Sequence, residues 1–229
     1  MRPRTWFNLF FRRSQCLKTT WTFRVAFLLL VTLLPLSTRS LWAPPFARTL
    51  TVQEHLTPAD AILIDNFDQD YLLFERAAAL HNARYSSRVL VLVPTSFSGD
   101  LEALTLEEAI ADVMIRIAHL TSAETVTVRQ LEPVSLNVAY QIRYYLRAEH
   151  IRSVLIVTSG FRARRSALIY GAILGEAGVA VSCVPVFGMT TPENWTHTWH
   201  GIQQVALQFL KLHYYRVYVL PFKRHAAQG

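Results

Sequence analysis

Short, almost continuously apolar runs alternate along this chain with longer stretches that have helical spacing. Residues 89–93 (VLVLV) and 153–157 (SVLIV) are apolar at nearly every position, as in strands that are buried on both faces. Such strands need cover on both sides, and the helical stretches between them can supply it. Strands joined by helices pair in parallel, with right-handed crossovers. The pattern therefore predicts an α/β domain of Rossmann-like, three-layer architecture with a mostly parallel sheet.

The predicted domain covers residues 59–229 and has a sheet of about five strands. The strands are expected at residues 61–65, 89–93, 124–131, 153–157 and 179–186. Helices are expected at residues 71–85, 106–120, 136–147, 162–176 and 201–212. Ser135 is the expected N-cap of the third of these helices, because a serine hydroxyl can accept from the free N–H groups of a first turn.

The positive charge of the chain is confined to its N-terminal part. Residues 1–48 hold eight basic residues and no acidic one, whereas the remaining 15 basic residues share the rest of the chain with all 16 acidic residues. A near-neutral domain lacks the positive field that a nucleic-acid-binding domain needs. Nucleic acid is therefore not an expected partner.

Residues 25–36 (VAFLLLVTLLPL) are the most apolar stretch of the chain and predict a membrane anchor over residues 21–42. The stretch is shorter than the roughly 20 residues that span a bilayer, but its flanks can extend it. Two arginines and two tryptophans bracket it, as headgroup contacts and an aromatic belt would: Arg24, Arg39, Trp21 and Trp42. On one helix the two tryptophans would lie about 30 Å apart, close to the hydrocarbon thickness.

The charge asymmetry predicts the orientation of this anchor. Most of the basic residues precede Arg24, so residues 1–20 are expected in the cytoplasm and the domain on the far side of an inner or plasma membrane. Residues 43–58 contain three prolines and are expected to be a linker. A cleaved signal peptide is the alternative, but Ala43 is followed by two prolines where a small-residue cleavage site would be needed.

In such folds ligands bind where the strands end, at a switch in strand order. Residues 158–165 (TSGFRARR) follow a buried strand with hydroxyls, a glycine and arginines. N–H groups at a helix start and arginine guanidinium groups bind phosphate or carboxylate. The expected anion-binding residues here are Thr158, Ser159, Gly160, Arg162 and Arg165. A solvated helix face is the alternative for arginines at such a place, and it is the expected role of Arg164.

Two further strand ends add candidate ligand-binding residues. Asp65 and Asn66 follow the first strand, and Asp65 is the best-placed candidate for a general base, whereas Asp68 and Asp70 are expected in turn or cap roles. Ser135 and Asn137 lie at the third strand-to-helix junction. No metal site is expected, because the pair His197 and His200 lacks a recognisable third ligand. Cys183 lies in an apolar run and is expected to be buried.

These stretches resemble the YdcF-like family, also called domain of unknown function 218, whose bacterial members include envelope proteins of the SanA and ElyC types. Residues 59–64 (ADAILI) look like the family's opening strand, and Ser135-Leu136-Asn137 like the start of its Ser-x-Asn-Thr motif. Val157-Thr158-Ser159 with Arg165 is similar to its Val-Thr-Ser-x-x-His-x-x-Arg motif. Arg162 stands at the family's histidine, and Gln208 stands where a glutamate is usual.

The resemblance implies an extracytoplasmic domain that works in cell-envelope biogenesis. Together with the arginines, it predicts binding of an anionic small molecule or of a lipid-linked precursor. S-adenosylmethionine is a cofactor that the resemblance alone allows. Two other functions remain open: a hydrolase or transferase that acts on phosphoesters with Asp65 as base, and a degenerate, non-catalytic partner in a membrane complex, for which a closed or apolar cleft is expected.

Overall fold

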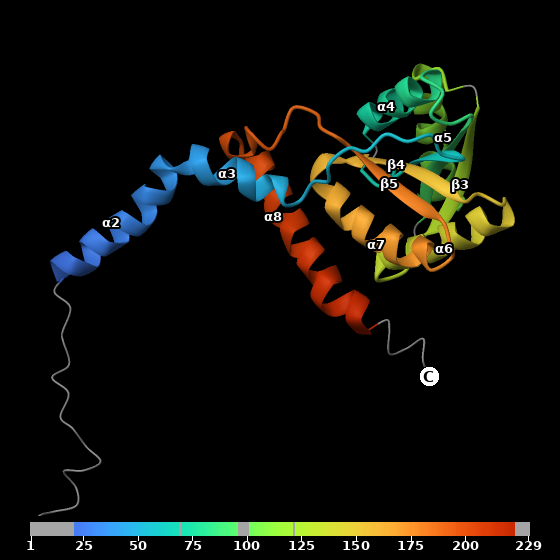
Figure 1. The fold of residues 1–229 in the computed structure, drawn as a ribbon. Coiled ribbons are helices and arrows are strands. Elements are labelled where there is room, and N and C mark those ends of the chain that lie inside the picture. Colours follow the sequence, from blue (N-terminus) through green and yellow to red (C-terminus); the bar gives the residue numbers. More distant parts are fainter. Residues whose placement is uncertain (1–20, 69, 96–100, 121, 223–229) are drawn as a thin grey trace, which may run out of the picture. The chain divides into compact units, whose positions relative to one another are not determined.

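The computed structural model describes residues 21–68, 70–95, 101–120 and 122–222, which fall into two units. The first unit ends at Ser40, and the second begins at Leu41 and contains the whole α/β domain (Figure 1). The strands of this domain are β1 (Ala61–Ile64), β2 (Arg88–Thr95), β3 (Ala123–Arg129), β4 (Ser153–Ser159) and β5 (Ala180–Val186). Each lies within a few residues of its predicted position.

All neighbouring strands pair in parallel, in the order β3-β2-β1-β4-β5. This confirms a Rossmann-like α/β fold with a five-stranded sheet. From β1 the chain continues to β2 and β3 on one side, whereas from β4 it continues to β5 on the other side. The adjacent strands β1 and β4 therefore form the switch point of the sheet. Their carboxyl ends therefore flank the position where this kind of fold binds ligands.

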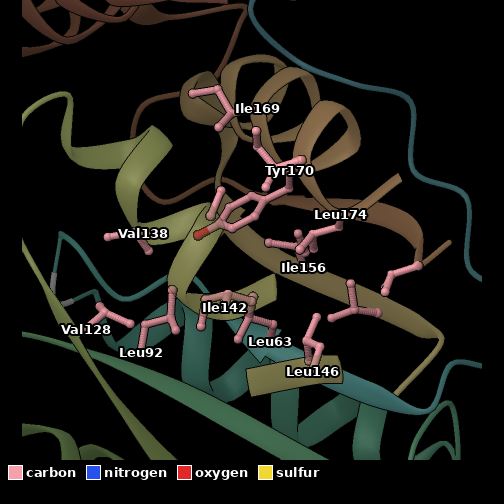
Figure 2. Packing of buried hydrophobic residues seen from close by; sticks show 14 of the residues in the cluster. Leu63, Leu92, Val128, Val138, Ile142, Leu146, Ile156, Ile169, Tyr170 and Leu174 are labelled. Atoms are coloured by element: carbon pink, nitrogen blue, oxygen red, sulfur yellow. The ribbon is translucent and has the colours of Figure 1, made fainter. Parts of the chain in front are cut away.

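Helices cover both faces of the sheet, as the buried strands require. One face is covered by α4 (Tyr71–Asn82) and α5 (Leu101–Ile117), and the other by α6 (Val134–Ala148) and α7 (Ala163–Gly175) (Figure 1). Successive side chains of a strand point to opposite faces, so both faces of each central strand are apolar. Figure 2 shows the second face, where Leu63 and Ile156 of the sheet belong to one cluster with Ile142 and Tyr170 of the helices. Cys183 is buried in the same cluster, as predicted.

Of two residues predicted to cap helices, Asp70 does so and Ser135 does not. Asp70 caps α4, because its carboxylate accepts from the N–H of Leu72 at 3.0 Å. The prediction of Ser135 as the N-cap of α6 is wrong, since the extended Pro133 is the cap and Ser135 lies inside the first turn. The Ser135 hydroxyl is bonded instead to Arg165, so a tertiary contact replaces the local one.

The last helix is longer than predicted. It runs through α8 (Trp199–His213) and continues as the wider π-helical turn η3 (Tyr214–Val219). The N-cap is Thr198, whose hydroxyl accepts from the N–H of Gly201. Tyr215 and Val219 are buried and continue the inner face of α8, which explains why the helix does not end at residue 212.

The predicted single anchor helix over residues 21–42 is interrupted. The exposed, apolar helix α2 (Trp21–Ser37) ends before Thr38, and α3 (Arg39–Arg48) follows. Pro35 removes a backbone donor near this break, and the Thr38 hydroxyl donates back to the Leu34 carbonyl at 2.7 Å. Among the described helices, none alone has the length and apolarity to cross a membrane. The two helices α2 and α3 meet that requirement only as a pair.

The first part of the predicted linker, residues 43–50, is packed on the domain. Ala43 and Ala47 of α3 are buried against Trp195, whose indole N–H donates to the Ala43 carbonyl at 2.9 Å. The Leu50 carbonyl accepts from the N–H of Arg164 at 3.0 Å. Small residues let this segment approach closely, so only residues 52–59 run as irregular chain toward β1.

Candidate functional site

The carboxyl ends of β1 and β4 bring two predicted site segments together. The N–H of Asp65 donates to the Val157 carbonyl at 2.9 Å, which continues the pairing of the two strands past the end of β1. Asp65 therefore lies beside Thr158, and the helical turn η1 (Gly160–Arg162) and α7 begin directly beyond it. The parallel register places the acid and the arginines at one end of the sheet.

Asp65 is the centre of a buried polar network. Its Oδ2 accepts from the hydroxyls of Thr158 and Ser166, each at 2.9 Å. Arg162 faces the same carboxylate, with Nε 3.2 Å from Oδ2 and Nη2 donating to Oδ1 at 3.4 Å. Hydrogen bonds and a cation of this kind stabilise a charged carboxylate. Asp65 is thus engaged by its neighbours and positions Arg162.

Arg162 has its charge compensated within the protein. Besides Asp65, it has Asp68 at 3.9 Å from Nη1, and its guanidinium lies 4.4 Å from the ring centre of Phe67. Such stacking on an aromatic face is typical of arginine. Arg162 is buried, but it still lines the cleft described below.

Arg165 is buried to 5% exposure and has weaker compensation, a contact between its guanidinium and the ring of Tyr215 with 5.7 Å to the ring centre. Its Nη1 donates to the Ser135 hydroxyl at 2.8 Å, and Nη2 donates to the Gln208 side-chain oxygen at 3.1 Å. Both partners are neutral, and Nε is buried without a hydrogen-bond partner. Within the described ranges no carboxylate forms an ion pair with this guanidinium. Burial, with the nearby charge of Arg162, lowers the pKa of Arg165 to about 10, so the group is still charged at neutral pH.

Arg165 and Arg162 lie in the wall of a cleft of about 360 Å³. Lys211 of α8 is a third cation at its rim, and burial together with the charges of Arg165 and Arg162 lowers the pKa of this lysine. The other lining residues are aromatic, polar or acidic, with one valine: Phe67, Asp68, Gln130, Glu132, Val134, Ser135, Tyr214 and Tyr215. The cleft thus combines cations with aromatic rings and carboxylate acceptors.

The structure divides the predicted site residues into three groups. Ser135, Arg162 and Arg165 line the cleft. Behind them, Asp65 and Thr158 are buried in the network, and Asn66 is also buried, with its side-chain oxygen lacking a hydrogen-bond partner. The remaining three are directed elsewhere: Ser159 and Gly160 line a separate cavity of about 180 Å³, and Asn137 donates to the Leu131 carbonyl at 3.0 Å.

Several residues of the site were not predicted as such. Ser166 completes the Asp65 network, while Gln208, Lys211 and Tyr215 reach the site from the last helix. The N–H of Ser135 is also bonded to the Tyr215 hydroxyl at 3.1 Å. All four lie outside the strand-end segments, so the rule that ligands bind at strand ends did not point to them.

Nothing in the cleft selects S-adenosylmethionine, the cofactor that the resemblance alone allowed. Arg162 and Arg165 would repel its sulfonium cation but could bind its carboxylate, and Asp68 and Glu132 also line the cleft. The turn after β1 holds the buried Asn66 and then Phe67, where a nucleotide-binding turn of this fold has glycines that let the ligand approach the backbone. No role is assigned to this cofactor.

Comparison with known proteins finds little. No protein-family model matches the chain, and no curated protein matches it. Among solved structures, the chain is similar to the reductase domain of the aureusimine biosynthetic cluster, with 10% sequence identity and a TM-score of 0.34. The match covers 69% of this chain and 56% of that domain, so this chain spans little more than half of its length.

Proposed function

We propose that this chain is a membrane-tethered member of the YdcF-like family whose extracytoplasmic domain binds an anionic small molecule or lipid-linked precursor. In this proposal residues 1–20 are cytoplasmic, the apolar segment from Trp21 anchors the chain in an inner or plasma membrane, and the domain acts in cell-envelope biogenesis. The one-sided basic charge and the exposed apolar α2 support the tether. The cleft supports the ligand.

The ligand proposal rests on Arg165, a buried cation that has no ion-pair partner among the described residues. A buried charge is unfavourable by several kcal/mol unless an opposite charge is present. Arg162 has such a partner in Asp65, whereas Arg165 donates hydrogen bonds to the neutral Ser135 and Gln208. Its remaining contact, with the ring of Tyr215 at 5.7 Å, is also neutral. The two hydrogen bonds aim the guanidinium at the cleft but supply no opposite charge. An anion in the cleft would supply the missing charge.

The surroundings of Arg165 favour a phosphate group that carries a sugar. A phosphate monoester offers several acceptor oxygens, which suit an arginine, Lys211 and the Ser135 hydroxyl. The ring of Tyr214 gives an apolar surface at the cleft wall, and the carboxylate of Glu132 can accept from hydroxyl groups. We therefore expect phosphorylated sugars, free or attached to a lipid, to be the ligand class.

The two other functions considered for the sequence have less support. A phosphoester hydrolase would need a free base, but Asp65 is engaged by Thr158, Ser166 and Arg162 and does not line the cleft. A purely structural domain would be expected to have a closed or apolar cleft, and this one is rich in charged and polar groups. Neither function is proposed.

Replacing Arg165 by glutamine should weaken binding of a hexose phosphate by roughly 10- to 100-fold. Charge-assisted hydrogen bonds contribute about 1.5–3 kcal/mol, and 1.4 kcal/mol corresponds to a factor of ten. Titration calorimetry of the full chain in detergent micelles measures this loss. Arg164→Gln is the matched control, because Arg164 is exposed one position away on the same helix. Equal affinities of the two variants would contradict the ligand proposal.

The tether predicts that the full chain stays in the membrane fraction of bacterial cells after an alkaline carbonate wash. Protease added to spheroplasts should digest the domain, because it faces away from the cytoplasm. The double variant Leu29→Arg/Leu33→Arg places two charges in α2 and should release the chain, since each charge opposes insertion by about 2.5–3.5 kcal/mol. A wild-type chain that the wash extracts, or a domain protected in spheroplasts, would contradict the tether.

A further inference from the structure

The last helix, α8 with η3, is apolar on the side that faces solvent as well as on the side that faces the domain. Val205, Leu212, Tyr215 and Val219 form the inner side and are buried. On the opposite side a second apolar row recurs at intervals of mostly three or four residues. This exposed stripe consists of Trp199, Leu207, Leu210, Tyr214, Tyr218 and Phe222.

Three rings of the exposed stripe contact one another along its C-terminal half. The rings of Tyr214 and Tyr218 stack with centroids 5.6 Å apart, and those of Tyr218 and Phe222 lie 5.2 Å apart. Leu210 and Tyr218 are 65% and 59% exposed. A helix on a domain surface ordinarily presents polar residues to water, so a continuous apolar row marks a binding surface.

The helix that carries the exposed stripe has charge of one sign. No acidic residue follows Glu193 in the sequence, whereas Lys211, Arg216, Lys223 and Arg224 are basic. Lys211 and Arg216 are exposed on the same helix as the stripe. If the same helix of a second copy packed on the stripe, basic residues would face basic residues, because this helix contains no carboxylate that could pair with them. The charge therefore selects an anionic partner.

We propose that the exposed stripe lies in the headgroup region of an anionic lipid bilayer. Aromatic and aliphatic side chains beside cationic ones are the composition of helices that lie in a membrane interface. Tyrosine and tryptophan suit this region because one end of the side chain is apolar and the other is polar. This contact uses residues separate from α2, so it goes beyond the tether of the proposed function.

The contact has a consequence for the cleft. Tyr214 of the exposed stripe and the neighbouring Lys211 also line the cleft that contains Arg165. A bilayer against the stripe would hold the mouth of the cleft at the level of lipid headgroups. A ligand whose phosphate belongs to a lipid would then reach Arg165 without leaving the membrane. This consequence rests on the proposed anion site, whereas the bilayer contact does not.

The test uses the full chain with Cys16→Ser and a single fluorescent label on Leu210→Cys, because Cys183 is buried. The matched control carries the label on Tyr144→Cys, an equally exposed side chain (68%) on α6. Both proteins are reconstituted in vesicles of phosphatidylcholine, with or without phosphatidylglycerol, that contain headgroup-nitroxide lipid. Quenching at residue 210 should be several-fold stronger than at residue 144, and stronger with phosphatidylglycerol.

Equal quenching at residues 210 and 144, or no effect of phosphatidylglycerol, would overturn the inference. So would cross-linking between Leu210→Cys copies without quenching, because a second copy would then cover the stripe. Flotation separates this inference from the tether. Chains that float only with phosphatidylglycerol vesicles would contradict the tether and support the stripe, and chains that float with neither would overturn both.

Discussion

Replacing Asp65 by asparagine is expected to lower the free energy of unfolding by about 3–5 kcal/mol, the usual loss when one partner of a buried ion pair is removed. The carboxylate is completely buried and faces Arg162, while it also accepts from Thr158 and Ser166. Asparagine keeps the shape but leaves the Arg162 charge without its closest partner. Denaturant unfolding of the full chain in detergent, followed by tryptophan fluorescence, measures the loss.

Two further variants distinguish a lost ion pair from a general effect of charge. Glu75→Gln removes an exposed acid of α4 and should change stability by less than about 0.5 kcal/mol. The pair Asp65→Leu/Arg162→Met removes both buried charges and should recover much of the loss, because apolar replacements of a buried ion pair are often neutral. An Asp65→Asn variant as stable as Glu75→Gln would show that Asp65 does not hold Arg162.

Replacing Arg165 by methionine is expected to leave the stability of the ligand-free chain unchanged or lower and to abolish its response to anions. The pKa of Arg165 is about 10 in the fold against 12.5 for a free arginine, so folding disfavours the charged form. This penalty is fully present below pH 10 and is relieved as the pH rises from 10 to 12.5. It amounts to about 3 kcal/mol at neutral pH. The two hydrogen bonds of the guanidinium are charge-assisted and contribute about 1.5–3 kcal/mol each, so their loss offsets or exceeds the relief of this penalty.

A phosphorylated ligand should stabilise the wild-type chain and not the variant. At a ligand concentration 100 times the dissociation constant, the wild-type chain gains about 2.7 kcal/mol, whereas Arg165→Met gains nothing. Unfolding measured with and without a hexose phosphate tests both parts. Arg164→Met serves as the control and should respond to the ligand as the wild type does. A ligand response of Arg165→Met equal to that of the wild type would refute the role of Arg165 in binding.

The local sequence pattern was sufficient for most of the secondary structure and for part of the site. Strands buried on both faces, such as residues 89–93, have an apolar signature that does not depend on their neighbours. The positions of Asp65, Arg162 and Arg165 beyond strand ends placed them correctly at one edge of the sheet, because parallel strands bring their carboxyl ends together.

The tertiary structure alone decided which of these residues face the cleft. Arg165 is hydrogen-bonded to Gln208, which is 43 residues away in the sequence, and Asp65 to Ser166, which is 101 residues away. The first contact depends on how the last helix packs against α7, and the second on the pairing of β1 with β4, the strand that precedes α7. No local pattern records either arrangement. For the same reason Ser135 bonds to Arg165 in place of capping α6, and Ala43 and Ala47 pack on Trp195 in place of forming a linker. The local spacing of apolar residues determined where helices and strands form. Long-range packing determined which residues their side chains contact.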